Sequence, residues 1–201
     1  MRSFFILIIL FFSKCYGQSV SEINKRLSFS DKFEFEREIR IYKYHSTSDQ
    51  IEVFRMYDKG KNDWSAYIYY YSNTFKSPTK INEFLFPKED VGDLKIKDAG
   101  LIWMNLLLCD IEYLPNMKDI SYKLKKSSLQ EEKGVFDIIS TKISVLDGKG
   151  YIVFIKNYKN ENEFSFDNPE IYLEDYPNVD ELISYNKILS VIRNELNLLK
   201  D

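Results

Sequence analysis

The chain has 201 residues, of which 44% are hydrophobic and 29% charged, and its net charge is −3 at neutral pH. This composition is typical of a globular protein and excludes a disordered tail, a collagen-like repeat and a multi-pass membrane protein. Two cysteines are too few for a disulfide-stapled scaffold. The negative charge and the scarcity of arginine argue against nucleic acid as a partner.

An uninterrupted apolar run, residues 4–12, follows Arg2 at the N-terminus. Nine helical residues rise about 14 Å, whereas the hydrocarbon core of a bilayer is about 30 Å thick, so this run is too short to span it. A basic start and a short apolar run are typical of a secretory signal peptide. We therefore predict a signal peptide over residues 1–17 and a single exported α+β domain, periplasmic or secreted, over residues 18–201.

Cys15 admits two interpretations. Cys15 and Gly17 lie third-last and last before Gln18, where a signal-peptide cleavage site requires small residues. Alternatively, Cys15 is acylated and anchors the chain in the cell envelope as a lipoprotein, although Lys14 departs from the small residues that usually precede such a cysteine. A membrane partner is expected only in this second case, because no later stretch is long and apolar enough to span a bilayer.

The first predicted strands follow a polar lead-in at residues 18–30, which is either a short helix or irregular. Residues 33–45 alternate apolar and polar side chains with a period of two, which is typical of a half-buried strand in an antiparallel sheet. Residues 51–57 and 64–72 are two more strand candidates. Gly60 suits the turn between them, so they form a predicted hairpin.

A predicted helix covers residues 98–113, after a stretch at 74–97 that reads mostly as loop. The helical segment is apolar except for one narrow polar stripe, so we expect it to be largely buried. Cys109, the only cysteine left after the predicted cleavage, lies in this segment. A buried free cysteine usually behaves as a small apolar residue, so we expect Cys109 to be unreactive.

The second half of the chain repeats the order of elements. Residues 135–146 and 150–156 are apolar and β-branched, and the Asp-Gly pair between them predicts a hairpin. Residues 163–167 predict a short edge strand, and the apolar period over residues 178–200 predicts a terminal helix. The expected fold is therefore α+β: an antiparallel sheet of about six strands in two three-strand groups, each followed by a helix, with the helices packed on one face.

Short motifs mark the ends of the predicted elements between residues 64 and 199. They are Trp103, Ile111-Glu112-Tyr113-Leu114-Pro115, Leu146-Asp147-Gly148, Phe166-Asp167-Asn168-Pro169 and Tyr176-Pro177. On these motifs the chain resembles a loose set of small exported bacterial proteins of unknown function. The resemblance implies a related fold and transfers no catalytic residue.

Tyrosines gather on the predicted strands. Tyr67, Tyr69 and Tyr71 share one face of the third strand, and Tyr42 and Tyr44 share one face of the first. A tyrosine offers apolar area and a hydroxyl at low entropic cost, which suits contact with a protein, peptide or glycan. The alternative is that these rings simply cover the second face of the sheet.

Acidic residues are dense between residues 161 and 181. Because Ca²⁺ prefers oxygen ligands, Asp167, Glu170, Glu174 and Asp175 are candidate metal ligands. The segment lacks the spacing of an EF-hand, and a solvated acidic edge is the alternative interpretation.

Catalytic motifs are missing from the sequence. His45, the only histidine, has no nucleophile motif beside it, and no glycine-rich phosphate loop is present. We therefore assign no catalytic residue and expect no cofactor. The function predicted from sequence is an exported, non-enzymatic module that binds a protein, peptide or glycan. The alternatives are a carboxylate-dependent hydrolase, with or without Ca²⁺, and an envelope-associated lipoprotein anchored through Cys15.

Overall fold

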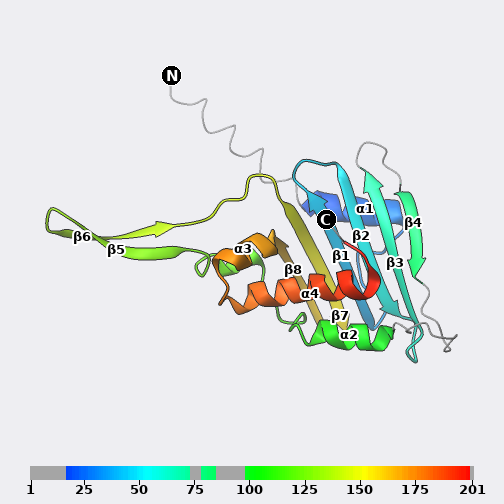
Figure 1. The fold of residues 1–201 in the computed structure, drawn as a ribbon. Helices are drawn as coiled ribbons and strands as arrows, with labels where there is room; N and C mark the ends of the chain where they lie inside the picture. Colours follow the sequence, from blue (N-terminus) through cyan, green and yellow to red (C-terminus); the bar gives the residue numbers. More distant parts are fainter. Residues whose placement is uncertain (1–16, 73–77, 85–97, 200–201) are drawn as a thin grey trace, which may run out of the picture.

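A six-stranded antiparallel sheet forms the centre of the protein (Figure 1). The computed structural model describes residues 17–72, 78–84 and 98–199. Across the sheet the strands lie in the order β4-β3-β2-β1-β7-β8. Their bounds are β1 (Arg37–His45), β2 (Gln50–Asp58), β3 (Trp64–Ser72), β4 (Pro78–Phe84), β7 (Lys149–Asn157) and β8 (Asn160–Asp167). The prediction of an α+β protein with an antiparallel sheet is confirmed.

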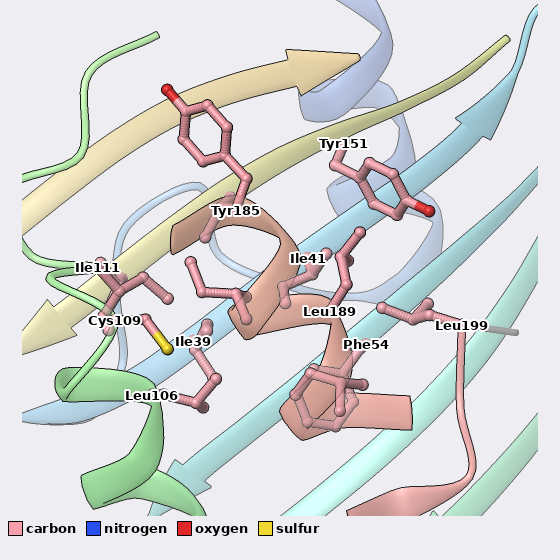
Figure 2. Close-up of a cluster of buried hydrophobic side chains, with 14 of the residues drawn as sticks. Ile39, Ile41, Phe54, Leu106, Cys109, Ile111, Tyr151, Tyr185, Leu189 and Leu199 are labelled. Atoms are coloured by element: carbon pink, nitrogen blue, oxygen red, sulfur yellow. The ribbon is translucent and has the colours of Figure 1, made fainter. Parts of the chain in front are cut away.

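Three helices cover one face of this sheet (Figure 1). They are α2 (Ala99–Leu107), α3 (Pro169–Asp175) and α4 (Asp180–Leu196), and a single 3₁₀ turn, η2 (Met117–Ile120), packs beside them. Apolar residues recur along α4 with the helical period, so one stripe of the helix faces the sheet. Figure 2 shows Tyr185 and Leu189 of this stripe among Ile39 and Phe54 of the sheet.

The opposite face of the sheet carries α1 (Gly17–Leu27). Ile23 and Leu27 of this helix pack on Tyr42, Val53 and Tyr71. Because successive side chains of a strand point to opposite faces, a strand that is apolar on both faces needs cover on both. The two helices predicted after the strand groups do share one face, but the polar lead-in, expected to be a short helix or irregular, forms α1 and covers the second face.

One edge of the sheet, the outer side of β8, is capped by the segment around residues 111–117. The side chain of Asn162 donates to the carbonyl oxygens of Ile111 and Leu114 at 3.1 and 2.9 Å. The backbone amide of Ser165 in turn donates to the side-chain oxygen of Asn116 at 3.1 Å. The Ser165 bond satisfies an edge amide that an open strand would offer to another strand, and the Asn162 bonds hold the capping segment in place.

A second, two-stranded sheet stands apart from the first. β5 (Lys126–Glu132) and β6 (Val135–Thr141) pair only with each other in the described part of the chain, and every residue of both strands is exposed. Figure 1 shows this hairpin projecting away from the helices and the six-stranded sheet. We call β5, β6 and their turn the arm.

The arm overturns the predicted second group of three strands. Residues 135–141 pair with 126–132 and not with 150–156, so the predicted hairpin around the Asp-Gly pair does not form. β7 instead pairs with β1 on one side and β8 on the other. Lys133 and Gly134 form the turn of the arm, and both have the positive φ (54° and 82°) that a two-residue type I′ hairpin turn requires.

Two further boundaries differ from the sequence prediction. The helix predicted over residues 98–113 ends at Leu107, and the chain then turns through Asp110, whose φ is +55°. β4 lies inside the stretch predicted as loop, so in the described residues four strands rather than three precede α2. The terminal helix is confirmed, and it ends at Leu196 before Asn197 in a left-handed conformation (φ 60°).

Residues 1–16, which hold Cys15 and nearly all of the predicted signal peptide, lie outside the described residues. Signal peptide, cleavage and acylation therefore stay predictions. In the ranges that the structure does describe, no helix combines the length and the apolar character needed to cross a membrane.

Candidate functional site

Two adjoining pockets form a groove on the α1 side of the sheet, over β1, β7 and β8. Their volumes are about 410 and 490 Å³, and Lys118, Ile152 and Ser165 line both. α1 and the loop after it form one wall, and the segment around η2 forms the other. The groove runs along the half of this face that α1 leaves open.

The floor of the groove is apolar and its rim is polar. Ile152 and Phe154 of β7 are half-buried, and they form the floor beside Tyr42. The ring of Phe154 meets that of Tyr42 edge to face, with centroids 5.7 Å apart. Ser165 and Lys118 stand on the side nearest η2. A mostly apolar floor with a few placed polar groups is the usual make-up of a ligand site.

A row of three residues across β1, β7 and β8 builds the second pocket. Tyr44 pairs with Gly150, and Gly150 pairs with Asp167. A Cβ on Gly150 would lie 1.9 Å from Cζ of Tyr44, so only glycine lets this ring lie across β7. The Tyr44 hydroxyl then donates to Asp167 Oδ1 at 2.8 Å, which fixes the orientation of both side chains.

Hydrogen bonds tie the first pocket to α1. The hydroxyl of buried Tyr42 donates to Asn24 Oδ1 at 2.5 Å, and Asn24 Nδ2 donates to Asp31 Oδ1 at 2.9 Å. Burial raises the pKa of Tyr42 to about 12. Hydrogen bonds from Asn24 and Ser21 lower the pKa of Asp31 below its usual value, so the carboxylate stays ionised at neutral pH.

A buried charged cluster connects β1 to the loop after α1, the part of the groove wall that contains Asp31. Glu38, which is fully buried, accepts hydrogen bonds from Nε of Arg40 and Nε of Arg55 at 2.7 and 2.9 Å. Arg40 also donates to the carbonyl oxygens of Ser30 and Lys32 at 2.5 and 3.0 Å. These bonds fasten the loop after α1 to β1 and so set the shape of the groove.

The structure separates the five candidate tyrosines. Tyr42 and Tyr44 line the groove, whereas Tyr67, Tyr69 and Tyr71 lie on β3 on the same face. Tyr42, Tyr69 and Tyr71 are buried, with exposed fractions of 9% or less, and pack with residues of α1 and the loop after it. Ligand binding by these rings stays a prediction, and Tyr42 and Tyr44 are the two that line the groove.

The four candidate metal ligands do not come together. Glu170 pairs with Arg193 at 2.6 Å, Asp175 with Lys126 at 3.1 Å, and Asp167 accepts from the hydroxyl of Tyr44. Glu174 is exposed at the end of α3. No three His, Cys, Asp or Glu residues gather into a possible metal site anywhere in residues 17–72, 78–84 and 98–199.

Neither Cys109 nor His45 is among the residues that line the groove. Cys109 is buried, its thiol donates to the carbonyl oxygen of Asn105 at 3.2 Å, and burial raises the pKa of the thiol. His45 ends β1 in register with Lys149. Comparisons with protein-family models, with curated proteins and with solved structures gave no match to this chain, so the resemblance noted above stays an expectation.

Sequence reasoning missed the residues at which the two pockets join. Lys118, Ile152 and Ser165 come from η2, β7 and β8, and none of them stands in a recognisable motif. Ile152 and Ser165 meet in the ladder of β7 and β8, and the segment at η2 packs on the edge of β8, a contact that residue spacing does not reveal.

Proposed function

We propose that the protein is an exported, non-enzymatic binding module whose groove over β1, β7 and β8 takes an extended peptide segment of a partner protein. The observation that carries this proposal is the junction of the two pockets at Lys118, Ile152 and Ser165. Each pocket lies within the size range of roughly 300–1,000 Å³ that is usual for ligand sites. Joined end to end, the pockets suit a long ligand better than a round one.

The chemistry of the groove favours a peptide. Ile152 and Phe154 offer apolar contact for side chains, and hydroxyl and carboxylate groups along the rim offer hydrogen bonds to a backbone. Lys118 is exposed and forms no ion pair with any residue that the structure describes, so its ammonium group is open to an acidic side chain or a carbonyl of the ligand.

The hydrolase alternative receives less support from the same residues. Acid–base cleavage of a glycosidic bond needs one carboxyl group whose pKa is raised, so that it holds a proton to donate. The pKa of Asp31, a carboxylate that lines the first pocket, is shifted the other way by its hydrogen bonds to Asn24 and Ser21. A binding role needs no such proton donor.

The test begins with peptides of random sequence displayed on phage and panned against the purified protein. Fluorescence anisotropy of a selected, labelled peptide then measures its Kd for the wild type and for Lys118→Glu. We expect Lys118→Glu to weaken binding about tenfold or more, since a hydrogen bond to a charged group contributes roughly 1.5–3 kcal/mol.

Lys159→Glu is the matched control, because Lys159 is an exposed lysine in the turn between β7 and β8 and lines neither pocket. Its Kd should equal that of the wild type. Equal loss in both variants would mean that general charge attraction binds the peptide. Failure to select any peptide, together with binding to an array of glycans, would replace the peptide by a sugar ligand.

A further inference from the structure

The arm is a strand pair without cover. Leu129, Phe136 and Ile138 lie on one of its faces, and each side chain is more than 60% exposed. An isolated two-stranded hairpin is marginally stable in water, and its open edges are templates for pairing with another strand. The arm therefore has the form of an element that is completed by a further chain.

Backbone groups on the outer side of β5 point away from the arm. The two-residue turn places Glu132 and Val135 in the hydrogen-bonded pair that flanks it. Since such pairs alternate along an antiparallel ladder, the residues whose amide and carbonyl groups face outward on β5 are Ser127, Leu129 and Glu131. A second strand that joins here must match these three positions.

The sequence of β5 is complementary to a second copy of itself when the two run antiparallel with their Leu129 residues opposite each other. If two copies of β5 run antiparallel about Leu129, each Lys126 lies opposite Glu132 of the second copy. The intermediate positions pair serine with glutamate and serine with glutamine, and Leu129 meets Leu129. No like charges face each other within the strand, and two cross-strand ion pairs of opposite charge form.

The other edge of the arm matches itself less well. Antiparallel pairing of β6 about Ile138 sets the carboxylate of Asp137 opposite the apolar side chain of Ile139 on each side. It forms no ion pair. Charge complementarity therefore selects the edge of β5 over that of β6.

We propose that the arm binds the arm of a second copy of this chain, β5 against β5, antiparallel about Leu129. The product is a four-stranded sheet with a two-fold axis at its centre. Leu129 already lies opposite Ile138 within each arm, so the pairing joins four aliphatic side chains into one row across four strands. The tip of each arm then lies beside the base of the other.

The proposed dimer leaves the groove free, so it is independent of the proposed function. Lys126 and Glu132 lie on the arm, and neither lines either pocket. Lys126 also contacts Asp175 at 3.1 Å, but its side chain is 62% exposed and so reaches solvent beside that contact. An interface made only of two arms is small, and small interfaces are usually weak and reversible.

Cysteine cross-linking tests the register directly. In an antiparallel ladder the two Cα atoms of a hydrogen-bonded pair are about 5.5 Å apart, which suits a disulfide. With Cys15 replaced by Ser, we expect Leu129→Cys to oxidise to a covalent dimer. Ile138→Cys is the matched control, because Ile138 is equally apolar and exposed (70% against 69%) but lies on the other edge. Cys109 is buried and stays.

Charge reversal tests the ion pairs by sedimentation equilibrium. The wild type should approach twice the mass of one 24.0 kDa chain as its concentration rises. Glu132→Lys should raise the dimer dissociation constant about tenfold, since it replaces two exposed ion pairs by two repulsions. The double variant Lys126→Glu/Glu132→Lys should restore the wild-type constant.

Three results would overturn the proposal. They are a monomer at all concentrations, a dimer that the reversals leave unchanged, and preferential cross-linking through Ile138→Cys. Loss of peptide binding in the groove has no bearing on these measurements, so failure of the dimer and failure of the proposed function are distinguishable.

Discussion

The β7–β8 hairpin and the arm are built from similar patterns and stand in opposite surroundings. Both are pairs of antiparallel strands joined by a two-residue turn, and both carry large apolar side chains. Tyr151 and Val153 of β7 are fully buried, whereas Leu129 and Ile138 of the arm are about 70% exposed. β7 lies between β1 and β8 with helices above it, and β5 and β6 pair with no further strand in the described residues.

The comparison shows that a hairpin with apolar side chains does not by itself specify what covers those side chains. In β7 the apolar residues are buried, and burial of apolar area is the main source of stability. In the arm the same residue types remain in water and contribute little to folding of the single chain. We therefore expect substitutions in the helix-and-sheet body to change the stability of the single chain, and substitutions in the arm to change the association of two chains.

The largest expected effect is in the buried charged cluster. Glu38→Ala leaves the guanidinium groups of Arg40 and Arg55 without their shared carboxylate, and breaking a buried pair costs about 3–5 kcal/mol. Urea denaturation measures the free energy of unfolding. Glu131→Ala in the arm is the control and should change it by less than about 0.5 kcal/mol. If Glu38→Ala lowers the free energy of unfolding by less than about 1 kcal/mol, the cluster does not stabilise the sheet.

A matched pair of leucines tests the comparison most directly. Leu189 is fully buried between α4 and the sheet, whereas Leu129 is exposed on the arm. We expect Leu189→Ala to lower the free energy of unfolding by about 2–5 kcal/mol, because it leaves a cavity in the core. Leu129→Ala should stay within about 0.5 kcal/mol. The measurement is urea denaturation at a protein concentration at which the chain is monomeric. Similar losses of unfolding free energy in the two variants would show that Leu129 stabilises the single chain as much as Leu189 does.

High pH should destabilise the helix-and-sheet body and spare the arm, which contains no tyrosine. Burial raises the pKa of Tyr42 to about 12, above the value of about 10 in an unfolded chain. The folded state therefore holds this proton more tightly. The resulting stability is fully present below pH 10 and is lost as the pH rises towards 12.

Tyr42→Phe removes this dependence at one site. A difference of two pKa units corresponds to about 2–3 kcal/mol. Between pH 10 and 12 the free energy of unfolding should therefore fall in both proteins, and the fall in Tyr42→Phe should be about 2–3 kcal/mol smaller than in the wild type. Urea titrations across this range measure the two slopes. Parallel slopes would mean that Tyr42 ionises as readily in the folded protein as in the unfolded chain.

The smallest expected effect on stability comes from removing the arm. Replacing residues 127–140 by two glycines deletes only exposed residues, so the free energy of unfolding should change by less than about 0.5 kcal/mol. The same variant should sediment as a monomer at every concentration. A marked loss of stability would show that the arm contributes to the folding of the single chain.

Some residues of the candidate site could be predicted from the sequence. The alternation in the first strand placed Tyr42 and Tyr44 on one face, and both line the groove, as does Asp167 from the acidic segment. Lys118 and Ser165 could not be predicted from it. They meet because the segment at η2 packs on the outer edge of β8, where Ser165 donates to Asn116, and no local pattern specifies that contact.

The mistaken hairpin has a physical cause as well. An Asp-Gly pair at residues 147–148 is a strong local turn signal, but β7 is a central strand and needs a neighbour on each side. β1 and β8 supply those neighbours, so residues 135–141 pair instead across the tighter turn at Lys133 and Gly134. The two available turns did not differ enough in sequence to decide the pairing.

Local chemistry by itself determined the strand and helix segments of this protein: the alternation in β1, the hairpin of β2 and β3, and the helical stripe of α4. These follow from backbone geometry and side-chain period, which act over a few residues. Tertiary structure alone decided which face α1 covers, which strands flank β7, that a groove opens over β7 and β8, and that the arm stands in solvent. Those outcomes depend on competition among distant segments for the same apolar surface, and that competition is settled only when the whole chain packs.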